Sequence, residues 1–407
     1  MFLKGRVQLK KNNGFLKGSL WVFSNELEHI DTQIKPGSWV ALENAQGESV
    51  AYGYFNPHSL IAFRVFERDP FQSEQATKAV FFERLNRAYK IRLKIYHEQI
   101  QKKEVSPFSF RLAFGESDFL PGLVVDLYEG IPSPVAVIQC HGAGADFLID
   151  WTKEWLEKFL KISSGVIRND LEIRKRENVP LFIKEWGLIP SEIYALEGGM
   201  RFFINVKEGQ KTGYFYDHRE NRSQLMKRVL SNQKMEVLDT FSYVGSWGLQ
   251  VLKKNSKARL LAVDSSPLAL EQLLKNALEN GLSDRVETLK IDVFKKEVSI
   301  KKAFDIVIVD PPQLISSAKN IWAGKHAYMK CYKNGFEKLS MDGTVVFSSC
   351  SYHLSWVDFL DCVHQASRAS NKSAQMTYVG TQAFDHPLLA SMPEAQYLKC
   401  VFVEGSC

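Results

Sequence analysis

The stretch at residues 237–248 reads Val237-Leu238-Asp239-Thr240-Phe241-Ser242-Tyr243-Val244-Gly245-Ser246-Trp247-Gly248, an apolar strand followed by a glycine-containing turn. A glycine such as Gly245 lets the backbone approach a ligand where the next helix begins. The spacing differs from the G-x-G-x-x-G of dinucleotide-binding proteins, and a turn of this kind also occurs where nothing binds. The interpretation of this turn therefore depends on the rest of the chain.

Short apolar strands and helices alternate strictly from residue 235 onward. Such alternation favours an α/β fold in which a parallel sheet carries helices on both faces, as in Rossmann-like domains. Ligands in these folds bind beyond the carboxyl ends of the strands, so the residues just after each strand are the candidate site. The predicted strands are Glu236–Phe241, Arg259–Asp264, Val286–Ile291, Asp305–Asp310 and Thr344–Ser349, with helices at about 247–254, 266–280, 318–340 and 355–369.

Carboxylates end the second, third and fourth of these strands. Asp264 is suited to accept hydrogen bonds from ribose hydroxyls and Asp292 from an adenine amino group, and Asp310 follows the fourth strand. One acid at a strand end is commonly a helix cap, but three in succession after a glycine turn indicate a ligand that contains a nucleoside. The same strand ends add further predicted cofactor-binding residues: Asp239, Phe241, Ser242, Gly245, Ser265 and Val293.

Two more features at these strand ends indicate catalysis. Pro311 and Pro312 stiffen the chain after Asp310, which suits a site that positions a flat base. Cys350 follows the fifth strand and has hydroxyl and imidazole side chains as neighbours. A buried structural thiol is the ordinary interpretation of a cysteine, but such a setting also lowers a thiol pKa and makes thiolate available. We therefore predict that Cys350 is a nucleophile.

Two smaller parts precede this domain. Residues 1–70 predict a small β domain, with short apolar runs separated by turn residues, and residues 71–190 predict an α+β domain. The third part, residues 191–407, opens with a hairpin around Gly198-Gly199. The main elements expected before it are strands at 38–42, 60–66, 123–128 and 135–139 and helices at about 76–101 and 146–161.

Composition restricts the class of protein. The 407 residues are 45% hydrophobic and 24% charged, which is typical of a globular protein. No apolar run reaches the roughly 18 residues of a membrane span, and no signal peptide is visible, so we expect a cytoplasmic protein without membrane contact. The six cysteines have no zinc-binding spacing, so we expect no metal.

The net charge of +6 permits nucleic-acid binding without requiring it. Basic residues gather in the stretch 1–20, which contains no acid. Such a stretch is either a solvated arm or a surface that contacts phosphate groups. The candidates for contact with nucleic acid are Lys4, Arg6, Lys10 and Lys11.

Together these residues resemble the PUA-containing class I methyltransferases that form 5-methylcytosine in large-subunit (23S) ribosomal RNA. The resemblance covers nearly the whole chain and is most specific at residues 209–222, Gly-Gln-Lys-Thr-Gly-Tyr-Phe-Tyr-Asp-His-Arg-Glu-Asn-Arg. The other matching stretches are 36–40, 53–61, 114–123, Cys350-Ser351, 385–387 and Pro393-Glu394.

The resemblance implies an N-terminal small β-barrel PUA domain, a central α+β domain like a THUMP substrate module, and a C-terminal methyltransferase domain that binds S-adenosylmethionine. The sheet of the last domain would have seven strands, the final one antiparallel, with 375–379 and 397–403 as its last two strands. Ribosomal RNA would be the partner, contacted by the PUA surface and the basic N-terminus. Relatives also include homodimers.

The resemblance further implies roles within the site. Phe215, Asp217 and Arg219 would complete the cofactor pocket, although Arg219 could instead pair with a neighbouring acid. Gly245 and the start of the following helix would face the methionine portion of the cofactor, Asp264 its ribose and Asp292 its adenine.

The implied chemistry depends on Cys350, whose thiolate would add to carbon-6 of a flipped-out cytosine and so activate carbon-5. Asp310 would hold the base at its N3 or amino edge, with Pro311 and Pro312 as a shelf beside it. The group that removes the carbon-5 proton is open among His353, Asp385 and His386.

Two departures from the family leave alternatives open. Gln313 stands where relatives usually have a basic residue, and Ser246 stands where the first turn often has a second glycine. The alternatives are methylation of uracil carbon-5, methylation of an exocyclic amine, which would not need Cys350, and a non-catalytic RNA-binding protein. A nicotinamide oxidoreductase is disfavoured because the G-x-G-x-x-G pattern is absent.

Overall fold

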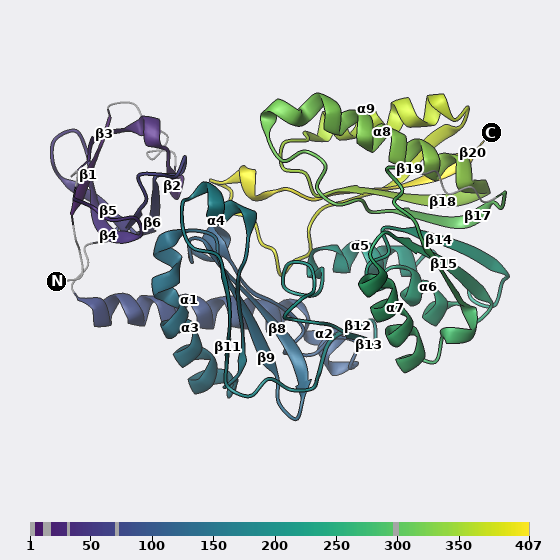
Figure 1. Cartoon of the computed structure of the whole chain (residues 1–407), viewed down its shortest axis with the longest axis horizontal. Coiled ribbons are helices and arrows are strands. Elements are labelled where there is room, and N and C mark those ends of the chain that lie inside the picture. Colours follow the sequence, from purple (N-terminus) through teal and green to yellow (C-terminus); the bar gives the residue numbers. More distant parts are fainter. Residues whose placement is uncertain (1–4, 11–17, 31–32, 70–72, 296–300, 407) are drawn as a thin grey trace. The chain divides into compact units, whose positions relative to one another are not determined.

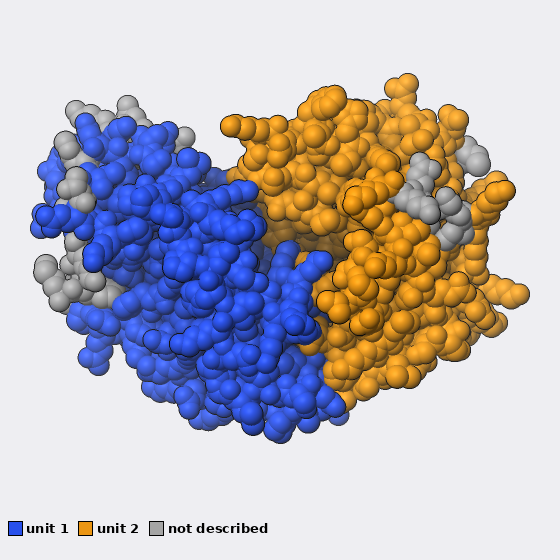
Figure 2. Space-filling view, in the orientation of Figure 1, with its two compact units in different colours: residues 1–195, 205–214, 384–395 blue, residues 196–204, 215–383, 396–407 orange. Residues whose placement is uncertain are grey.

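The computed structural model describes residues 5–10, 18–30, 33–69, 73–295 and 301–406 (Figure 1). The chain divides into two compact units, which Figure 2 shows in different colours. Unit 1 consists of residues 1–195, 205–214 and 384–395, and unit 2 consists of residues 196–204, 215–383 and 396–407. Each unit is therefore assembled from segments that lie far apart in the sequence.

The first sheet of unit 1 has six short strands in the order β2-β6-β5-β4-β1-β3. Only β1 and β4 run parallel in this sheet. Apolar side chains from all parts of the sheet form one buried cluster, so the sheet closes around its own core as a small β-barrel, as the family resemblance implies. The strands are β1 Arg6–Leu9, β2 Trp21–Val22, β3 Leu27–Ile30, β4 Ser38–Glu43, β5 Ser49–Phe55 and β6 Phe63–Glu67.

The second sheet follows the order β11-β10-β9-β8-β12-β13, with β7 also beside β8. Strand β8 runs antiparallel to β7, β9 and β12, whereas β9 and β10 run parallel. Helices α1 (Glu74–Ile95) and α3 (Leu148–Trp155) contribute to its apolar core, which confirms the predicted α+β class. The remaining elements are α2 His97–Gln101, α4 Glu172–Arg176, β7 Phe110–Phe114, β8 Leu123–Ile131, β9 Val135–Cys140, β10 Gly165–Asn169, β11 Phe182–Trp186, β12 Glu192–Glu197 and β13 Met200–Phe203.

The helix expected at 76–101 is in fact two helices, because α1 ends before Tyr96 and α2 follows. The buried face of α1 includes a charged residue, Arg92. Its guanidinium donates to the two carboxylate oxygens of Asp118 at 2.7 and 2.6 Å. A buried charge is tolerated when it is paired and hydrogen-bonded in this way, which hydrophobic periodicity alone does not reveal.

Unit 2 is built on a seven-stranded sheet with the order β16-β15-β14-β17-β18-β20-β19. The first five strands are parallel, and β20 runs antiparallel to both β18 and β19. The order reverses between β14 and β17, where open α/β sheets form their ligand crevice. The strands are β14 Met235–Thr240, β15 Ala258–Asp264, β16 Val286–Lys290, β17 Phe304–Val309, β18 Leu339–Ser349, β19 Ser373–Gly380 and β20 Lys399–Ser406.

Helices cover both faces of this sheet, with α6 and α7 on one face and α8 and α9 on the other (Figure 1). Side chains of α8 such as Tyr332 and Phe336 are buried in the same cluster as Val309 and Phe347 of the sheet. This arrangement confirms the predicted Rossmann-like α/β fold. The helices are α5 Arg219–Met226, α6 Gly248–Lys254, α7 Pro267–Glu279, α8 Ile321–Lys338 and α9 Trp356–Ala369.

Strand β18 begins earlier than the sequence predicts, at Leu339 rather than at Thr344. Its register with β17 shifts on the way, since Phe304 pairs with Leu339 but Ile306 pairs with Thr344. The extra residues bulge, and Asp342 has a left-handed backbone with φ +61°. The bulge interrupts the apolar pattern, and for this reason the first part of the strand is hidden in the sequence.

Candidate cofactor and catalytic site

The turn after β14 has a strained backbone. Phe241, Tyr243 and Gly245 have φ values of +63°, +47° and +86°. Left-handed conformations cost bulky residues on the order of 1–3 kcal/mol each, and such strain collects at ligand sites. The turn is held to the next strand by a hydrogen bond of 3.0 Å from the Ser242 amide to the Val263 carbonyl.

Packing explains why residue 245 is a glycine, whereas the sequence analysis expected the glycine to let the backbone approach a ligand. A Cβ atom at this position would lie 2.9 Å from side-chain atoms of both Leu249 and Leu273. Together with its positive φ, this contact means that glycine is required for the turn to pack against α6 and α7. The need for glycine is therefore explained by the fold, without any ligand.

Two buried polar atoms at this turn have no hydrogen-bond partner in the described part of the chain, Asp239 Oδ1 and Ser242 Oγ. The other carboxylate oxygen of Asp239 accepts the Gly248 amide at 3.0 Å. Burial raises the pKa of Asp239 to about 8 despite this hydrogen bond, and the carboxylates of Asp310 and Asp264 contribute to the rise. Buried polar atoms are normally satisfied, so these two fit a site that a polar, cationic ligand group completes.

Asp264, at the end of β15, is positioned by two backbone amides. It accepts hydrogen bonds from Tyr243 at 3.0 Å and from Ser266 at 2.9 Å. A carboxylate has about four acceptor positions, so it keeps capacity for ligand hydroxyls. The neighbouring Ser265, also among the predicted cofactor residues, is exposed at the same edge.

Asp292, after β16, is held in a similar way. Its Oδ1 accepts the Phe294 amide at 3.0 Å, and its Oδ2 lies 3.4 Å from the ammonium of Lys295, which is largely exposed. Val293 is buried between them in the apolar core. Asp264 and Asp292 thus follow adjacent parallel strands, and the structure brings both to the carboxyl edge.

The stretch 215–219 contributes to the same unit. Phe215 packs edge-on against Tyr243 of the turn, with ring centroids 5.2 Å apart. Asp217 is buried and accepts a hydrogen bond of 2.6 Å from the hydroxyl of Tyr397. Phe215 therefore lies beside the predicted cofactor turn.

Arg219 has the acidic neighbour that the alternative interpretation requires. Its Nε lies 3.5 Å from Glu197 Oε2, and its guanidinium stacks on Tyr216 with the central carbon 4.9 Å from the ring centroid. Glu197 also binds Arg222 at 2.6 Å. Burial acts to raise the pKa of Glu197, but the two arginines outweigh it and hold the pKa below its ordinary value. A structural task thus accounts for Arg219, and its contact with cofactor stays a prediction.

Three side chains hold Asp310 at the end of β17. His218 Nε2 lies 3.2 Å from its Oδ1, Trp247 Nε1 donates to its Oδ2 at 3.2 Å, and the Ser348 hydroxyl donates to its Oδ1. Burial acts to raise the pKa of Asp310, but His218 and Ser348 outweigh burial and keep the pKa below its ordinary value. Asp310 is therefore an oriented carboxylate at neutral pH.

Sequence reasoning does not identify His218, Trp247 or Ser348 as site residues. Each lies in or next to a motif that the sequence singles out: the stretch 209–222, the glycine turn and the end of the fifth strand. The rings of His218 and Trp247 are 5.2 Å apart, and the Asn221 amide nitrogen lies 3.2 Å from His218 Nδ1. Only the fold reveals that these motifs meet at one carboxylate.

The loop after β17 is tied to the loop after β18. Pro311 is buried, whereas Pro312 and Gln313 are exposed. The Ile315 amide donates to the Ser351 hydroxyl at 3.1 Å. The proline shelf and the cysteine loop are thereby held together at the same edge of the sheet.

Cys350 lies directly after β18 and is half-buried. Val309 of β17 pairs in register with Phe347 of β18, so Asp310 and Cys350 follow neighbouring parallel strands. The sheet thus brings the predicted nucleophile to the same edge as the predicted base-holding carboxylate. The other described cysteines are buried: Cys140, Cys331, Cys362 and Cys400.

The three candidates for the proton-removing base differ in their settings. His353 is half-buried in the loop after β18, with its ring 5.1 Å from that of Tyr352. Asp385 and His386 belong to unit 1, where Asp385 accepts the Arg111 amide at 3.0 Å and pairs with His386 at 2.7 Å. These contacts give Asp385 a structural task inside unit 1.

Two of the four basic N-terminal candidates, Lys4 and Lys11, lie outside the described residues. Arg6 lies 3.1 Å from Glu43, but its side chain is 75% exposed. Lys10 donates to a backbone carbonyl at 3.0 Å and is also exposed. Arg6 and Lys10 are thus accessible on the surface of the first sheet.

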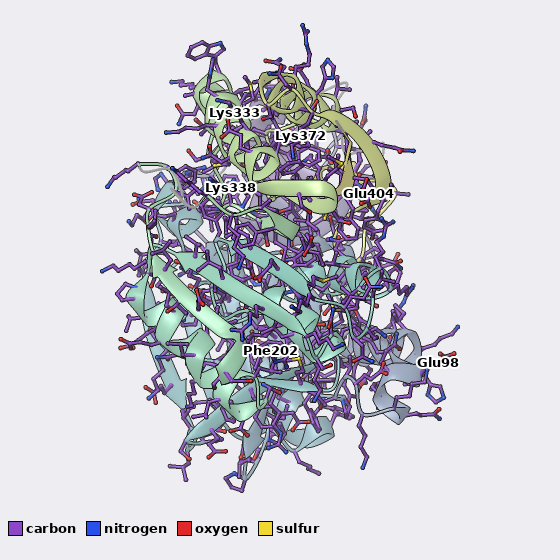
Figure 3. All side chains as sticks on the ribbon, turned by 90° about the vertical axis from the view of Figure 1, so that its right-hand side faces the viewer. Glu98, Phe202, Lys333, Lys338, Lys372 and Glu404 are labelled. Atoms are coloured by element: carbon purple, nitrogen blue, oxygen red, sulfur yellow. The ribbon has the colours of Figure 1, made fainter. Side chains whose placement is uncertain are left out.

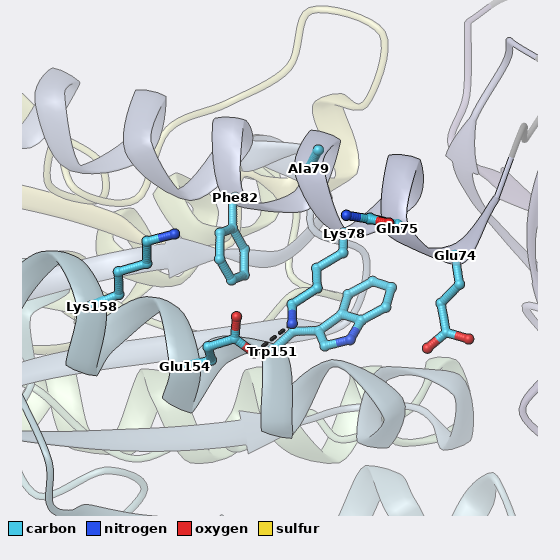
Figure 4. Close-up of a pocket in the computed structure, with 8 residues that line it drawn as sticks. All are labelled: Glu74, Gln75, Lys78, Ala79, Phe82, Trp151, Glu154 and Lys158. Carbon is cyan, nitrogen blue, oxygen red and sulfur yellow. Dashed lines mark hydrogen bonds and ion pairs between the residues drawn. The ribbon is translucent and has the colours of Figure 1, made fainter.

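A separate pocket of about 590 Å³ lies in unit 1 between α1 and the segment 151–158 (Figure 4). Lys78 and Glu154 form an ion pair in it, and Phe82 and Trp151 supply apolar walls. Its lining contains no nucleophile or general base in a constrained setting, so it is not the candidate site. Among the residues that the structure describes, no cluster of three or more metal-ligating side chains occurs. No described helix combines the length and apolarity needed to cross a bilayer.

Comparison with protein-family models matches residues 6–68 to a PUA-like domain and residues 194–325 to the TRM5/TYW2 methyltransferase domain. The ribosomal RNA large subunit methyltransferase I of Aliivibrio fischeri is 30% identical over 388 residues, which cover 93% of this chain and 93% of the relative. The protein of the same name from Cronobacter sakazakii is 29% identical, with 96% of each chain covered.

Two solved structures have the same fold. A protein from Streptococcus mutans, described as a SAM-dependent methyltransferase, superposes with a TM-score of 0.79 at 16% identity and covers 98% of this chain and 100% of its own. A second, described as a methyltransferase complexed with SAH, has a TM-score of 0.78 at 17% identity and covers 99% and 100%. The chain is therefore an S-adenosylmethionine-dependent methyltransferase, and it belongs to the ribosomal RNA large subunit methyltransferase I family.

Proposed function

We propose that this protein methylates carbon-5 of a cytosine in large-subunit ribosomal RNA through a covalent adduct with Cys350. The RNA class follows from the names of the relatives. One observation supports the chemistry above the others: Asp310, a carboxylate at neutral pH, and Cys350 follow neighbouring strands at the ligand edge. Methylation of an exocyclic amine would use the carboxylate but would leave the cysteine without a role.

Carbon-5 of cytosine is a poor nucleophile, and addition of a thiolate corrects this. The Cys350 sulfur forms a bond to carbon-6. The electrons of the carbon-5–carbon-6 double bond are displaced from carbon-6, so that carbon-5 becomes nucleophilic like the carbon of an enamine. S-adenosylmethionine, when bound, supplies the methyl group that carbon-5 takes. A base then removes the carbon-5 proton, the double bond re-forms, and the carbon–sulfur bond breaks to return the Cys350 thiolate.

Asp310 orients the cytosine ring during these reaction steps. An ionised carboxylate only accepts hydrogen bonds, so Asp310 suits the exocyclic amino group of cytosine rather than an unprotonated N3. Because His218, Trp247 and Ser348 hold the carboxylate before RNA arrives, little reorganisation is needed when the base binds. The stiff Pro311-Pro312 pair forms the adjoining wall.

The cofactor residues divide along the sheet edge. Asp239 and Ser242, with their unsatisfied buried atoms, suit the charged amino-acid end of S-adenosylmethionine. Asp264 suits the ribose hydroxyls and Asp292 the adenine amino group, since each keeps acceptor capacity. Phe215 lies beside the same turn and supplies an apolar surface.

We expect the Asp264→Ala variant to bind S-adenosylmethionine about tenfold to a hundredfold more weakly, because hydrogen bonds to a charged acceptor each contribute roughly 1.5–3 kcal/mol. Isothermal titration measures this directly. Asp284→Ala is the matched control, since the Asp284 side chain is 80% exposed in the loop before β16. Equal affinities in the two variants would remove Asp264 from the cofactor site.

The three parts of the chain would have different functions. We assign RNA binding to residues 1–70 and 71–190 and methyl transfer to residues 191–407. The match to a PUA-like domain and the exposed Arg6 and Lys10 support the first assignment. Phosphate contacts of this kind make RNA affinity fall as salt rises. Ribosomal RNA as substrate also agrees with the cytoplasmic location that the sequence predicts.

The test of the proposed function is mass-spectrometric mapping of modified nucleosides in ribosomal RNA from a strain that lacks this protein. We expect one 5-methylcytosine of the large-subunit RNA to disappear and to return with the wild-type chain but not with Cys350→Ala. Loss of a 5-methyluracil or of an N-methylated base would replace the proposal with the corresponding alternative. An unchanged set of nucleosides would exclude ribosomal RNA as the substrate.

A further inference from the structure

A buried lysine lies next to the proposed nucleophile. Lys399 is the first residue of β20, and the antiparallel register pairs it with Ser349, the residue before Cys350. Its ammonium donates to the carbonyl of Ser351 at 3.2 Å and to the carbonyl of Tyr397 at 3.0 Å. The ammonium is thereby anchored on the residue that directly follows Cys350.

The setting of Lys399 is unusual, because the residue is only 3% exposed. Burial lowers the pKa of Lys399 to about 8, and the charge of the Cys350 thiolate opposes this fall. The two carbonyls offer dipoles but no countercharge, whereas a buried cation is normally paired with an anion. The thiolate form of Cys350 would supply such an anion, and its charge acts to raise the pKa of Lys399.

Other titratable groups near this corner do not supply that anion. Burial raises the pKa of Tyr328 to about 12 and raises the pKa of Cys400 well above its ordinary value, so both are neutral at neutral pH. The negative charge of Asp310 contributes to the raised pKa of Cys400. The carboxylate oxygens of Asp310, however, already accept hydrogen bonds from Trp247 and other donors. The nearby charges therefore leave Cys350 as the group that Lys399 affects most directly.

We propose that Lys399 is a positioning residue whose positive charge keeps Cys350 in the thiolate form before RNA binds. The thiol proton goes to water, and the ammonium stabilises the sulfur anion that remains. The same charge favours the last step of the reaction, because it stabilises the thiolate that leaves carbon-6. This role rests on the proposed covalent function, but the charge effect itself is measurable without RNA.

The test is the rate of Cys350 alkylation by iodoacetamide as a function of pH, measured on the full chain carrying Cys407→Ser and without RNA. The thiols of Cys140, Cys331, Cys362 and Cys400 are buried with raised pKa values and react slowly, and an added Cys350→Ser substitution identifies the signal of interest. We expect an apparent thiol pKa below the ordinary value of about 8.5. Lys399→Met should slow alkylation at neutral pH by about tenfold, and Lys399→Arg should retain most of the rate.

Lys372→Met is the matched control, because Lys372, which is labelled in Figure 3, also donates to a backbone carbonyl. That carbonyl belongs to Leu339, at the opposite end of β18. The profile of Lys372→Met should equal that of the wild type. A wild-type profile in Lys399→Met, or equal slowing in Lys399→Arg, would overturn the proposal. If Lys399→Met does not fold, Lys399→Gln replaces it in the same comparison, because it also removes the charge at this position. The methylation assay of Cys350→Ala tests the covalent function separately.

Discussion

Replacing Cys350 with alanine is expected to lower the rate of methyl transfer to ribosomal RNA by at least about a thousandfold, because carbon-5 of cytosine loses its activation. Binding of S-adenosylmethionine is expected to be unchanged, since Asp239 and Asp264 lie in the last residues of β14 and β15 and Asp292 follows β16, all on strands other than β18. Single-turnover transfer of labelled methyl groups measures the first effect, and isothermal titration measures the second.

Cys331→Ala is the matched control for this experiment. Cys331 is a buried cysteine of α8 and is not among the predicted site residues, so its loss should cost about 1 kcal/mol of stability without changing turnover. A second readout uses RNA with 5-fluorocytosine at the target, which blocks loss of the carbon-5 substituent. The wild type should form a denaturation-resistant complex with this RNA, and Cys350→Ala should not. Full turnover in Cys350→Ala would exclude the covalent mechanism and favour amine methylation.

Asp310→Asn is expected to reduce turnover by about a hundredfold to a thousandfold, as is typical when a preorganised electrostatic contact to the reacting group is lost. The substitution keeps the shape of the side chain but removes the charge that faces His218 and that, in the proposed function, accepts from the cytosine amino group. The effect should appear in kcat more than in cofactor affinity, and single-turnover kinetics at saturating cofactor separate the two.

The matched control is Asp305→Asn, at the start of the same strand, where the carboxylate accepts the Glu236 amide at 2.8 Å. This variant should keep wild-type turnover. The pH profile gives a further check. Because the native pKa of Asp310 is lowered, the carboxylate contributes above its ordinary pKa and is lost only as the pH falls through the lowered value. Wild-type activity should therefore show no loss from Asp310 between roughly pH 5 and 8, and an acid limb that disappears in Asp310→Asn within that range would contradict the assignment.

Much of the fold is readable from the sequence because its signals are local. Apolar runs of strand length alternate with amphipathic helices from β14 onward, and the last residues of each strand identify the carboxyl edge. Asp264, Asp292, Asp310 and Cys350 could be assigned to that edge for this reason alone. The early start of β18 could not, because a bulge interrupts the apolar pattern there.

The side chains that contact these residues could not be predicted from the sequence. His218, Trp247 and Ser348 come from three separate segments, and no spacing indicates that they converge on Asp310. Lys399 looks like an ordinary lysine at the start of the last strand until the antiparallel register sets it beside Ser349. Such pairings depend on contacts between residues far apart in the chain.

The sequence therefore indicates the succession of strands and helices along the methyltransferase domain, the residues at its carboxyl edge and the family. Which side chains meet there follows from the tertiary structure alone: Arg219 has Glu197 as its neighbour, Gly245 is needed for packing, and the buried ammonium of Lys399 is hydrogen-bonded to the residue after Cys350. The physical reason is that secondary structure follows from short-range periodicity. Pairing, burial and pKa values follow instead from the packing of distant segments, which no local pattern encodes.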